Sequence, residues 1–271
     1  RGTQLCNECG DGKYFRMFKY GCFKNSKLQS FIVAGIFKYH RIRKSFYEQI
    51  DRYICLNDNQ IRLLINIGFD PNKIIKKYNF VPDAEANLKA IKVKELPERY
   101  VVFYGRIGEE KGIKMLMNIW DELKDIPLVV MGGGPLEVEF KSWAEKQSDV
   151  YFLGYTQHDK CLSIVKGGEF VIFPSIWYEG CSMVEIESES LGKGLIATDL
   201  GFSEEAVHNG VNGYKVKLGD ERGFIDIINK LWNNSDECRK IGENARRDYE
   251  EKYMPEDNYQ QLIEIYRQSL N

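Results

Sequence analysis

The residues best suited to chemistry lie in the segment PSIWYEGCSMVEIESESLGKG, which covers residues 174–194. Two carboxylates, Glu179 and Glu187, are separated there by seven residues. Between them the chain is expected to enter a helix, whose first backbone N–H groups have no partner within the helix. The residues expected to present these groups are Gly180, Cys181, Ser182 and Met183. The segment therefore predicts a ligand-binding loop that leads into a helix.

The helix after this loop carries three glutamates, and its periodicity separates them. At about 100° per residue, Glu187 lies near Val184 on the apolar side, whereas Glu185 and Glu189 point to another side. A carboxylate on an apolar face needs hydrogen-bond partners, and the two hydroxyls of a ribose diol would supply them. The simpler alternative is an acidic helix with three solvated glutamates; the apolar neighbours of Glu187 favour the binding role.

A second cluster, YGRIGEEKG at residues 104–112, places two cations near the start of a helix. Gly105 lets the backbone turn after a strand, Arg106 projects a guanidinium, and Lys111 precedes the next helix. Two cations beside a helix N-terminus suit a diphosphate, through bidentate Arg bonding and the positive end of the helix. The alternative is a strand-to-helix turn with solvated charges.

A third cluster, Gly132-Gly133-Gly134-Pro135, also ends a strand and starts a helix. Such glycine loops are common in Rossmann-like domains. Gly133 is therefore included only as a position where a ligand could approach the backbone closely.

Three cysteines near the N-terminus, Cys6, Cys9 and Cys22, have the spacing C-x2-C-x12-C. Thiolates at such spacings can bind a structural zinc ion, which needs a fourth ligand. Free buried thiols are the alternative. The other four cysteines are scattered, which favours reduced thiols over a disulfide framework: Cys55, Cys161, Cys181 and Cys238.

The stretch from Lys13 to Lys44 contains nine Lys or Arg residues, no acidic residue and many aromatic residues. This composition suits docking on an anionic membrane surface, or an acceptor carried on a lipid diphosphate. A solvated helix face over the core explains it equally well.

The elements that must position these clusters alternate between strand and helix from Tyr100 onward. Strands are expected at 100–104, 127–131, 150–153, 170–173 and 194–198, and helices at 111–123, 137–146 and most of 221–270. This alternation predicts a doubly wound parallel sheet. The three clusters follow its strands, at the edge where open α/β sheets bind ligands.

The first hundred residues predict fewer strands. They suggest a helical stretch to about Gln49, a strand at 52–56, a helix through Ile67 and a short strand and turn in KKYNFVPD. This is too little for an independent Rossmann domain, so its first βαβ units are expected to be missing, in a chain that opens on Arg-Gly-Thr. The expected division is a partial N-terminal domain at 1–97, a nucleotide-binding domain at 98–253 and a C-terminal helix at 254–271 that packs back on the first.

Composition narrows the class of protein. The chain has 271 residues, 43% of them apolar, and a formal charge of -2, which argues against nucleic acid as a partner. It contains no run of about 18 to 20 apolar residues and no opening signal peptide. A cytoplasmic protein is expected.

The clusters together resemble glycosyltransferase family 4. The resemblance rests on the E-x7-E pair after PS, on GKGLIATDLG and NGVNGY downstream, on the GR and EKG pair upstream, and on FLGY at 152–155. It implies the GT-B fold, with two Rossmann-like domains, a nucleotide-sugar donor and retention of anomeric configuration. Cys6, Cys9 and Cys22 resemble the cysteines found in a subset of the polysaccharide-assembling members of this family.

Carried over by residue, the resemblance implies that Arg106 and Lys111 hold the diphosphate and stabilise it as it leaves. Glu179 would contact the donor sugar and Glu187 the ribose hydroxyls. The loop from Leu153 to Tyr155 would pass by the base. The common E-G-F-G segment reads Glu-Gly-Cys-Ser here, which narrows the space beside the sugar and leaves the donor open.

The function expected is a retaining hexosyltransferase that moves a sugar from a UDP-sugar or GDP-sugar to a polysaccharide or glycolipid acceptor, with no cofactor needed for catalysis. Two alternatives stay open. One is another GT-B enzyme, such as a nucleotide-sugar epimerase or a phosphorylase. The other is a nucleotide-sugar-binding fragment that is inactive by itself, since the acceptor side and often a catalytic histidine come from early N-terminal loops.

Overall fold

The computed structural model describes residues 6, 8–91, 93 and 95–270. The chain divides into two compact units, one formed by 78–259 and the other by 1–77 with 260–271. The sequence placed these divisions at 97/98 and 253/254. In the structure the first division lies nearer the N-terminus, because residues 78–88 are attached to the larger unit.

The larger unit is built on a sheet of six parallel strands. Their order across the sheet is β5 (Val150–Gly154), β4 (Leu128–Met131), β3 (Val101–Tyr104), β6 (Val171–Phe173), β7 (Leu195–Thr198) and β8 (Gly213–Val216). Numbered from β3, this is the Rossmann order 3-2-1-4-5-6. The five expected strands are confirmed. β8 was missed because its sequence, GYKV, is short and contains a lysine.

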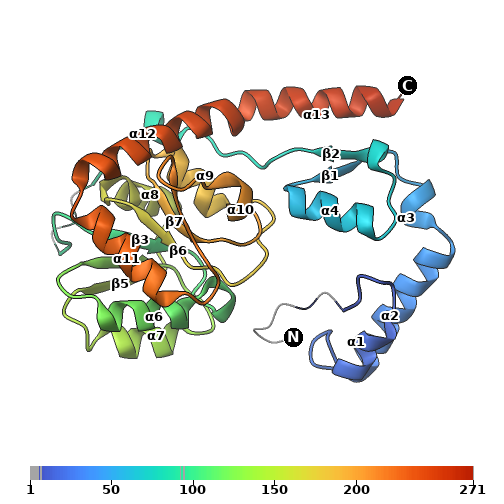
Figure 1. Ribbon diagram of the computed structural model, residues 1–271, viewed down its shortest axis with the longest axis horizontal. Helices are drawn as coiled ribbons and strands as arrows, with labels where there is room; N and C mark the ends of the chain where they lie inside the picture. Colours follow the sequence, from blue (N-terminus) through green and yellow to red (C-terminus); the bar gives the residue numbers. More distant parts are fainter. Residues whose placement is uncertain (1–5, 7, 92, 94, 271) are drawn as a thin grey trace. The chain divides into compact units, whose positions relative to one another are not determined.

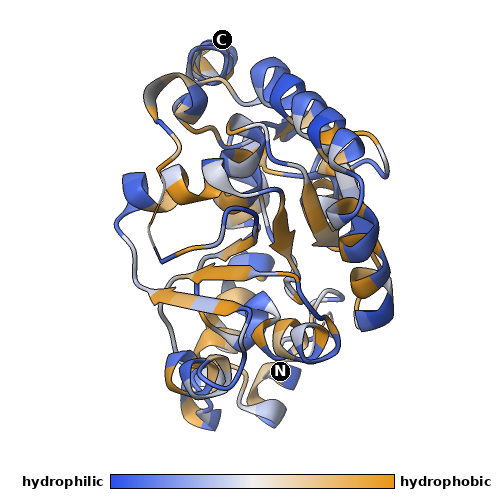
Figure 2. Cartoon of the chain, turned by 90° about the vertical axis from the view of Figure 1, so that its left-hand side faces the viewer, coloured by the Kyte–Doolittle hydropathy of each residue, from blue (hydrophilic) through white to orange (hydrophobic). Residues whose placement is uncertain are grey.

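Helices cover both faces of this sheet (Figure 1). One face packs against α6 (Ile113–Glu122), α7 (Glu137–Ala144) and α11 (Glu221–Trp232), and the other against α8 (His158–Gly167) and α9 (Met183–Ser190). Every residue of β3, β4, β6 and β7 except Thr198 is apolar, and all are buried, as expected for strands covered on both sides. Figure 2 shows hydrophobic strands and helices in which hydrophilic and hydrophobic residues alternate.

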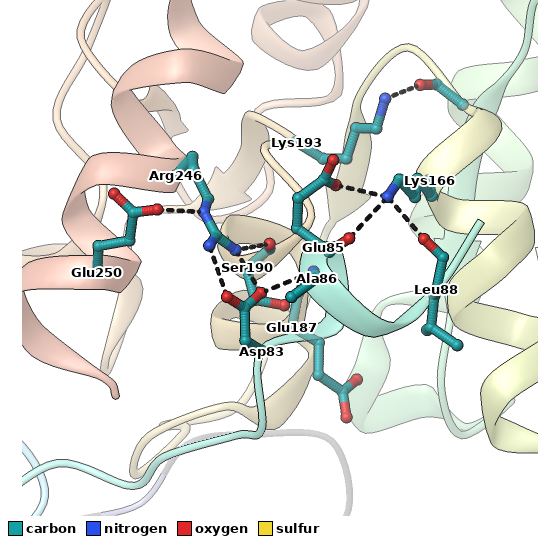
Figure 3. Close-up of polar contacts among 11 residues, drawn as sticks. Asp83, Glu85, Ala86, Leu88, Lys166, Glu187, Ser190, Lys193, Arg246 and Glu250 are labelled. Carbon is teal, nitrogen blue, oxygen red and sulfur yellow. Dashed lines mark hydrogen bonds and ion pairs between the residues drawn. The ribbon is translucent and has the colours of Figure 1, made fainter. Parts of the chain in front are cut away.

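The first residues of the larger unit are attached to it by α5 (Ala84–Asn87) and the residue before it. Asp83 forms two ion-pair contacts with Arg246 of α12 (Ser235–Lys252), at 2.7 and 2.8 Å. Arg246 also donates to the carbonyl of Ser190 at the end of α9 (Figure 3). Lys166 of α8 donates to the carbonyls of Glu85 and Leu88. These contacts explain why the division falls before residue 78.

The larger unit also contains η2 (Glu109–Lys111) and α10 (Ser203–Ala206). The C-terminal helix α13 (Pro255–Leu270) crosses the division at 259/260. Its last part belongs to the smaller unit, where the carbonyl of Gln268 accepts a hydrogen bond from Arg52.

The smaller unit contains, in chain order, α1 (Phe15–Tyr20), α2 (Lys27–Ile42), α3 (Ser45–Glu48), β1 (Tyr53–Cys55), α4 (Asp58–Asn66), η1 (Pro71–Lys73) and β2 (Ile74–Lys76). Within its described residues, β1 and β2 form a two-stranded parallel sheet. The helical stretch and the first strand agree with expectation. The second strand begins two residues before KKYNFVPD, because the ladder pairs Ile74 with Tyr53.

Candidate functional site

The candidate site lies at the carboxyl ends of β3 and β6, which are neighbours in the sheet. The chain passes from β3 to β4 on one side and from β6 to β7 on the other, so the strand order reverses between β3 and β6. Crevices at such switch points bind ligands in open α/β sheets. The two clusters that contain Arg106 and Glu179 follow these two strands directly.

Glycines let the loops after β3 and β4 approach each other. A Cβ atom on Gly132 would lie 1.8 Å from the carbonyl oxygen of Gly105. A Cβ on Gly134 would lie 2.5 Å from the carbonyl oxygen of Ile107. Gly132 and Gly134 are therefore needed for loop packing, whereas Gly133 lies between them at the rim of the site.

Two hollows at this edge share Tyr104, Gly105 and Arg106. The first has a volume of about 370 Å³ and the second about 320 Å³. The expected site residues that line the first are Gly105, Arg106, Gly133 and Tyr155. Those that line the second are Gly105, Arg106, Lys111, Glu179, Cys181, Ser182 and Met183. The structure thus brings most of the expected residues to one edge of the sheet.

Glu179 and Lys111 form an ion pair beside the second hollow. The Lys111 Nζ lies 2.6 Å from the Glu179 Oε1, which also accepts a hydrogen bond from the Ser175 hydroxyl at 2.9 Å. The glycine that follows Lys111 makes this approach feasible, since a Cβ on Gly112 would lie 1.9 Å from the carbonyl oxygen of Pro174. Both side chains are mostly buried, so their charges interact with limited screening.

Arg106 lies at the junction of the two hollows and points to solvent. Its side chain is 62% exposed, and its Nε is 3.4 Å from a carboxylate oxygen of Glu110. An exposed ion pair of this kind contributes little to the stability of the fold. The guanidinium can therefore exchange Glu110 for an anionic ligand at small cost.

Glu187 is buried and lies next to the first hollow. Its Oε1 is 2.8 Å from the Nε2 of His158, which lines that hollow at the start of α8. Burial raises the pKa of Glu187, and the hydrogen bond from His158 opposes the rise. Burial and the nearby Glu187 also hold the pKa of the Tyr104 hydroxyl well above its usual range.

His158 is a site residue that the sequence interpretation missed. The available signal was its position, directly after the loop that follows β5, on the same edge of the sheet as the other clusters. A single exposed histidine at a helix start does not stand out without its contact to Glu187.

The interpretation of α9 needs a correction. Glu185 and Glu189 are only 1% and 2% exposed, compared with 8% for Glu187, so neither of them lies on a solvated side. The helical periodicity correctly separated the faces, but from Glu185 to Ser190 α9 is enclosed by the sheet, α10, α5 and α12. The alternative of three solvated glutamates is wrong as well. Burial raises the pKa of Glu185 to about 8 and that of Glu189 well above its usual range.

Three expected residues, Leu153, Gly180 and Glu187, line neither hollow, and Cys181 lines the second but also has a structural contact. Leu153 packs against the core beneath α8 and does not line either hollow, and neither does Gly180. The buried Cys181 accepts a hydrogen bond from the backbone N–H of Asn79 at 3.4 Å. By contrast, Tyr155 is 85% exposed at the rim of the first hollow.

The pKa of Cys9 is raised, first by burial and then by the nearby Cys22 and Cys6. Within the described residues, no three His, Cys, Asp or Glu side chains are arranged as a metal site. Cys6 and Cys22 are exposed, which is at odds with the alternative of buried thiols. Zinc binding stays a prediction.

Apolar side chains are exposed along α2, among them Leu28, Phe31 and Ile36. Among the described helices, none combines the length and the hydropathy that a membrane span requires. Peripheral docking through α2 remains a prediction.

Residues 85–248 match the family model described as "Glycosyl transferases group 1". O-antigen chain mannosyltransferase C from Escherichia coli is 25% identical over 173 residues, which are 62% of this chain and 46% of that protein. Alpha-D-kanosaminyltransferase from Streptomyces kanamyceticus is 26% identical over 69% of this chain and 51% of its own. The chain therefore spans about half the length of these relatives.

Solved structures show the same fold. Anabaena HepE in complex with UDP superimposes with a TM-score of 0.72 at 19% identity, over 80% of this chain and 64% of that one. Sucrose-phosphate synthase from Thermosynechococcus elongatus gives 0.71 at 20% identity, over 84% and 60%. The expected GT-B fold is confirmed.

Proposed function

Because the chain belongs to the glycosyl transferases group 1 family, we propose that it is the donor-binding part of a retaining glycosyltransferase of the E-x7-E type, which uses a nucleotide-diphosphate sugar. The observation that carries this proposal is the Lys111–Glu179 ion pair at the strand-order reversal, between Arg106 and the start of α9. A partly buried cation held by a carboxylate, with an exposed guanidinium nearby, fits a ligand that carries both phosphate and sugar.

The diphosphate is assigned to Arg106 and Lys111. Lys111 forms an ion pair with Glu179. When the sugar leaves, negative charge grows on the diphosphate, and cations that are already in place lower the barrier most in a site from which water is excluded. Arg106 would add the two-pronged contact that a guanidinium makes with phosphate oxygens.

The ribose is assigned to Glu187, whose carboxylate adjoins the first hollow through His158. The base would then extend across that hollow toward Gly133 and Tyr155, which line it. The sugar is assigned to the second hollow, where Glu179 would contact it. Retention of configuration is part of the proposal and follows from the family resemblance.

The acceptor is proposed to be a glycan or a lipid-linked glycan, and the reaction a step in cell-surface polysaccharide synthesis. The relatives' names support this, since they include an O-antigen chain mannosyltransferase and a D-rhamnosyltransferase. Transfer belongs to the whole protein, because the chain spans about half of its relatives. Work at the inner face of the membrane is proposed from the basic and apolar α2.

Calorimetric titration of the chain with UDP, GDP and the matching nucleosides tests the donor site. Tighter binding of a diphosphate than of its nucleoside is expected, and Lys111→Ala should remove most of the difference. Lys114→Ala is the matched control, because Lys114 lies one turn along and pairs with the exposed Glu109. Equal affinity for diphosphate and nucleoside would refute the phosphate assignment. In the whole protein, sugar transfer rather than epimerisation is the expected activity.

A further inference from the structure

Glu185 is a buried carboxyl group that the assignments above leave without a role. It lies on α9, two residues before Glu187, and its side chain is enclosed by protein. Its Oε1 accepts a hydrogen bond from the Ser203 hydroxyl at 2.6 Å. Among the described residues, its Oε2 has no hydrogen-bond partner.

This contact pattern fits a neutral acid. An ionised carboxylate offers about four acceptor positions, and burying it with a single hydrogen bond is strongly unfavourable. A protonated carboxyl group has a far smaller desolvation penalty. In agreement, burial raises the pKa of Glu185 to about 8, although the hydrogen bond from Ser203 opposes the rise.

Ser203 connects Glu185 to the backbone of Glu179. It begins α10, and the residue before it, Phe202, donates its N–H to the carbonyl of Glu179 at 3.1 Å. Gly201 approaches the same residue so closely that a Cβ would lie 2.7 Å from the Glu179 nitrogen. The turn 201–203 thus supports the backbone of Glu179, and Glu185 holds the end of that turn.

We propose that Glu185 is a positioning residue of the donor site: as a neutral acid it holds Ser203 and, through the turn 201–203, Glu179, and its ionisation weakens binding of the nucleotide diphosphate. The inference rests on the proposed function. The charge of Glu185 interacts with both Glu179 and Lys111. A negative charge there reduces the positive potential that Lys111 presents to the phosphates.

The other titratable groups around Glu185 do not account for the same effect. The thiol of Cys181 interacts electrostatically with Glu185, Glu189 and Glu205, but burial raises its pKa to about 12. The hydroxyl of Tyr253 interacts electrostatically with Glu189 and Glu185. Burial raises its pKa above the pH range of the experiment. Glu189 lies one turn along α9, and the charges that act on it are those of Asp248 and Lys252 of α12 and of Glu185.

The test is a pH series of UDP and GDP binding by calorimetry, from pH 6.5 to 9, with four proteins: wild type, Glu185→Gln, Ser203→Ala and Glu189→Gln. For the wild type, Kd should rise by about tenfold above pH 8, the order of effect of one added charge near the phosphates at an effective dielectric constant of about 20. Glu185→Gln should abolish this rise. Ser203→Ala should move it to higher pH, because the lost hydrogen bond favoured the charged form. Glu189→Gln should keep the wild-type profile.

Titration of the nucleotide itself is common to all four proteins and cancels in the comparison. A flat wild-type profile, or the same rise in Glu185→Gln, would overturn the inference while the donor site stands. Absence of binding at every pH would overturn both. Infrared spectroscopy provides an independent measurement: a protonated carboxyl band present at pH 7 should weaken in Glu185→Gln, and an unchanged band would show that Glu185 is ionised.

Discussion

The Nζ of Lys111 and the Oε1 of Glu179 lie 2.6 Å apart, although the two residues come from loops that follow different strands of the sheet. The ion pair holds both side chains in place. A diphosphate that binds Lys111 must compete with Glu179, and this competition would leave Glu179 available to contact the donor sugar.

Lys111→Ala in the whole enzyme is expected to lower kcat by about 100- to 1,000-fold, the typical effect of removing a group that stabilises charge developing in the transition state. A cation that only held the ground state would instead raise KM and leave kcat intact. Steady-state kinetics on Lys111→Ala and on the control Lys114→Ala distinguish these. An unchanged kcat in Lys111→Ala would place this lysine outside the reaction.

Glu187→Ala is expected to weaken donor binding by about 1 to 3 kcal/mol, because a ribose hydroxyl loses its charged acceptor. The measurement is a cycle of two proteins and two ligands: wild type and Glu187→Ala, each with a nucleoside diphosphate and its 2′,3′-dideoxy analogue. The two losses should not add, since both remove the same contact. Additive losses would contradict the ribose assignment. Glu179→Ala should chiefly lower kcat instead.

Glu185→Gln and Glu189→Gln are each expected to stabilise the chain at neutral pH. Burial raises the pKa of Glu185 from 4.5 to about 8, so between these values the unfolded chain has lost a proton that the folded chain retains. The stability supplied by the neutral group is complete below pH 4.5 and falls as pH rises, by about 1.4 kcal/mol per unit, until about pH 8.

Urea unfolding of the three proteins from pH 5 to 8 measures this effect. The advantage of Glu185→Gln should be a few kcal/mol at pH 7 and should shrink toward zero as pH approaches 4.5. An advantage that did not vary with pH would indicate better packing rather than a difference in proton binding.

Asp83→Ala is expected to destabilise the chain by about 1 to 3 kcal/mol, because Arg246 loses its two-pronged partner in a half-buried position. Glu250→Ala is the matched control, since it removes a more exposed partner of the same Arg246 and should cost under about 1 kcal/mol. Equal losses of stability in the two variants would show that the Asp83–Arg246 pair contributes no more than the Glu250–Arg246 pair.

The stability that the Asp83–Arg246 pair contributes is expected to depend on pH. The hydrogen bond from Arg246 lowers the pKa of Asp83, so its stabilisation is present above pH 3.8 and is lost as pH falls through the lower folded value. The difference in unfolding free energy between wild type and Asp83→Ala should therefore shrink only in strong acid. A difference that disappeared already at pH 6 would contradict the assignment.

The sequence alone determined five of the six strands of the larger sheet and the edge at which its charged clusters gather. Short apolar runs such as VVFY and LVVM, bounded by turn residues, are typical of strands covered on both faces, and polar residues that follow such strands collect at one edge. Arg106, Lys111 and Glu179 were expected at one edge in this way, and the structure places all three beside the same hollow. Local pattern was sufficient because it requires only the neighbours along the chain.

Only the tertiary structure decided what surrounds each carboxylate. Periodicity gives the direction of Glu185 and Glu189 on α9, but their burial depends on α10 and α12, which lie later in the chain. The contact between His158 on α8 and Glu187 on α9 likewise joins two residues that are 29 positions apart in the chain. Whether a glutamate is solvated, paired or held neutral depends on groups that are distant in sequence, because burial and hydrogen bonding act through space rather than along the chain.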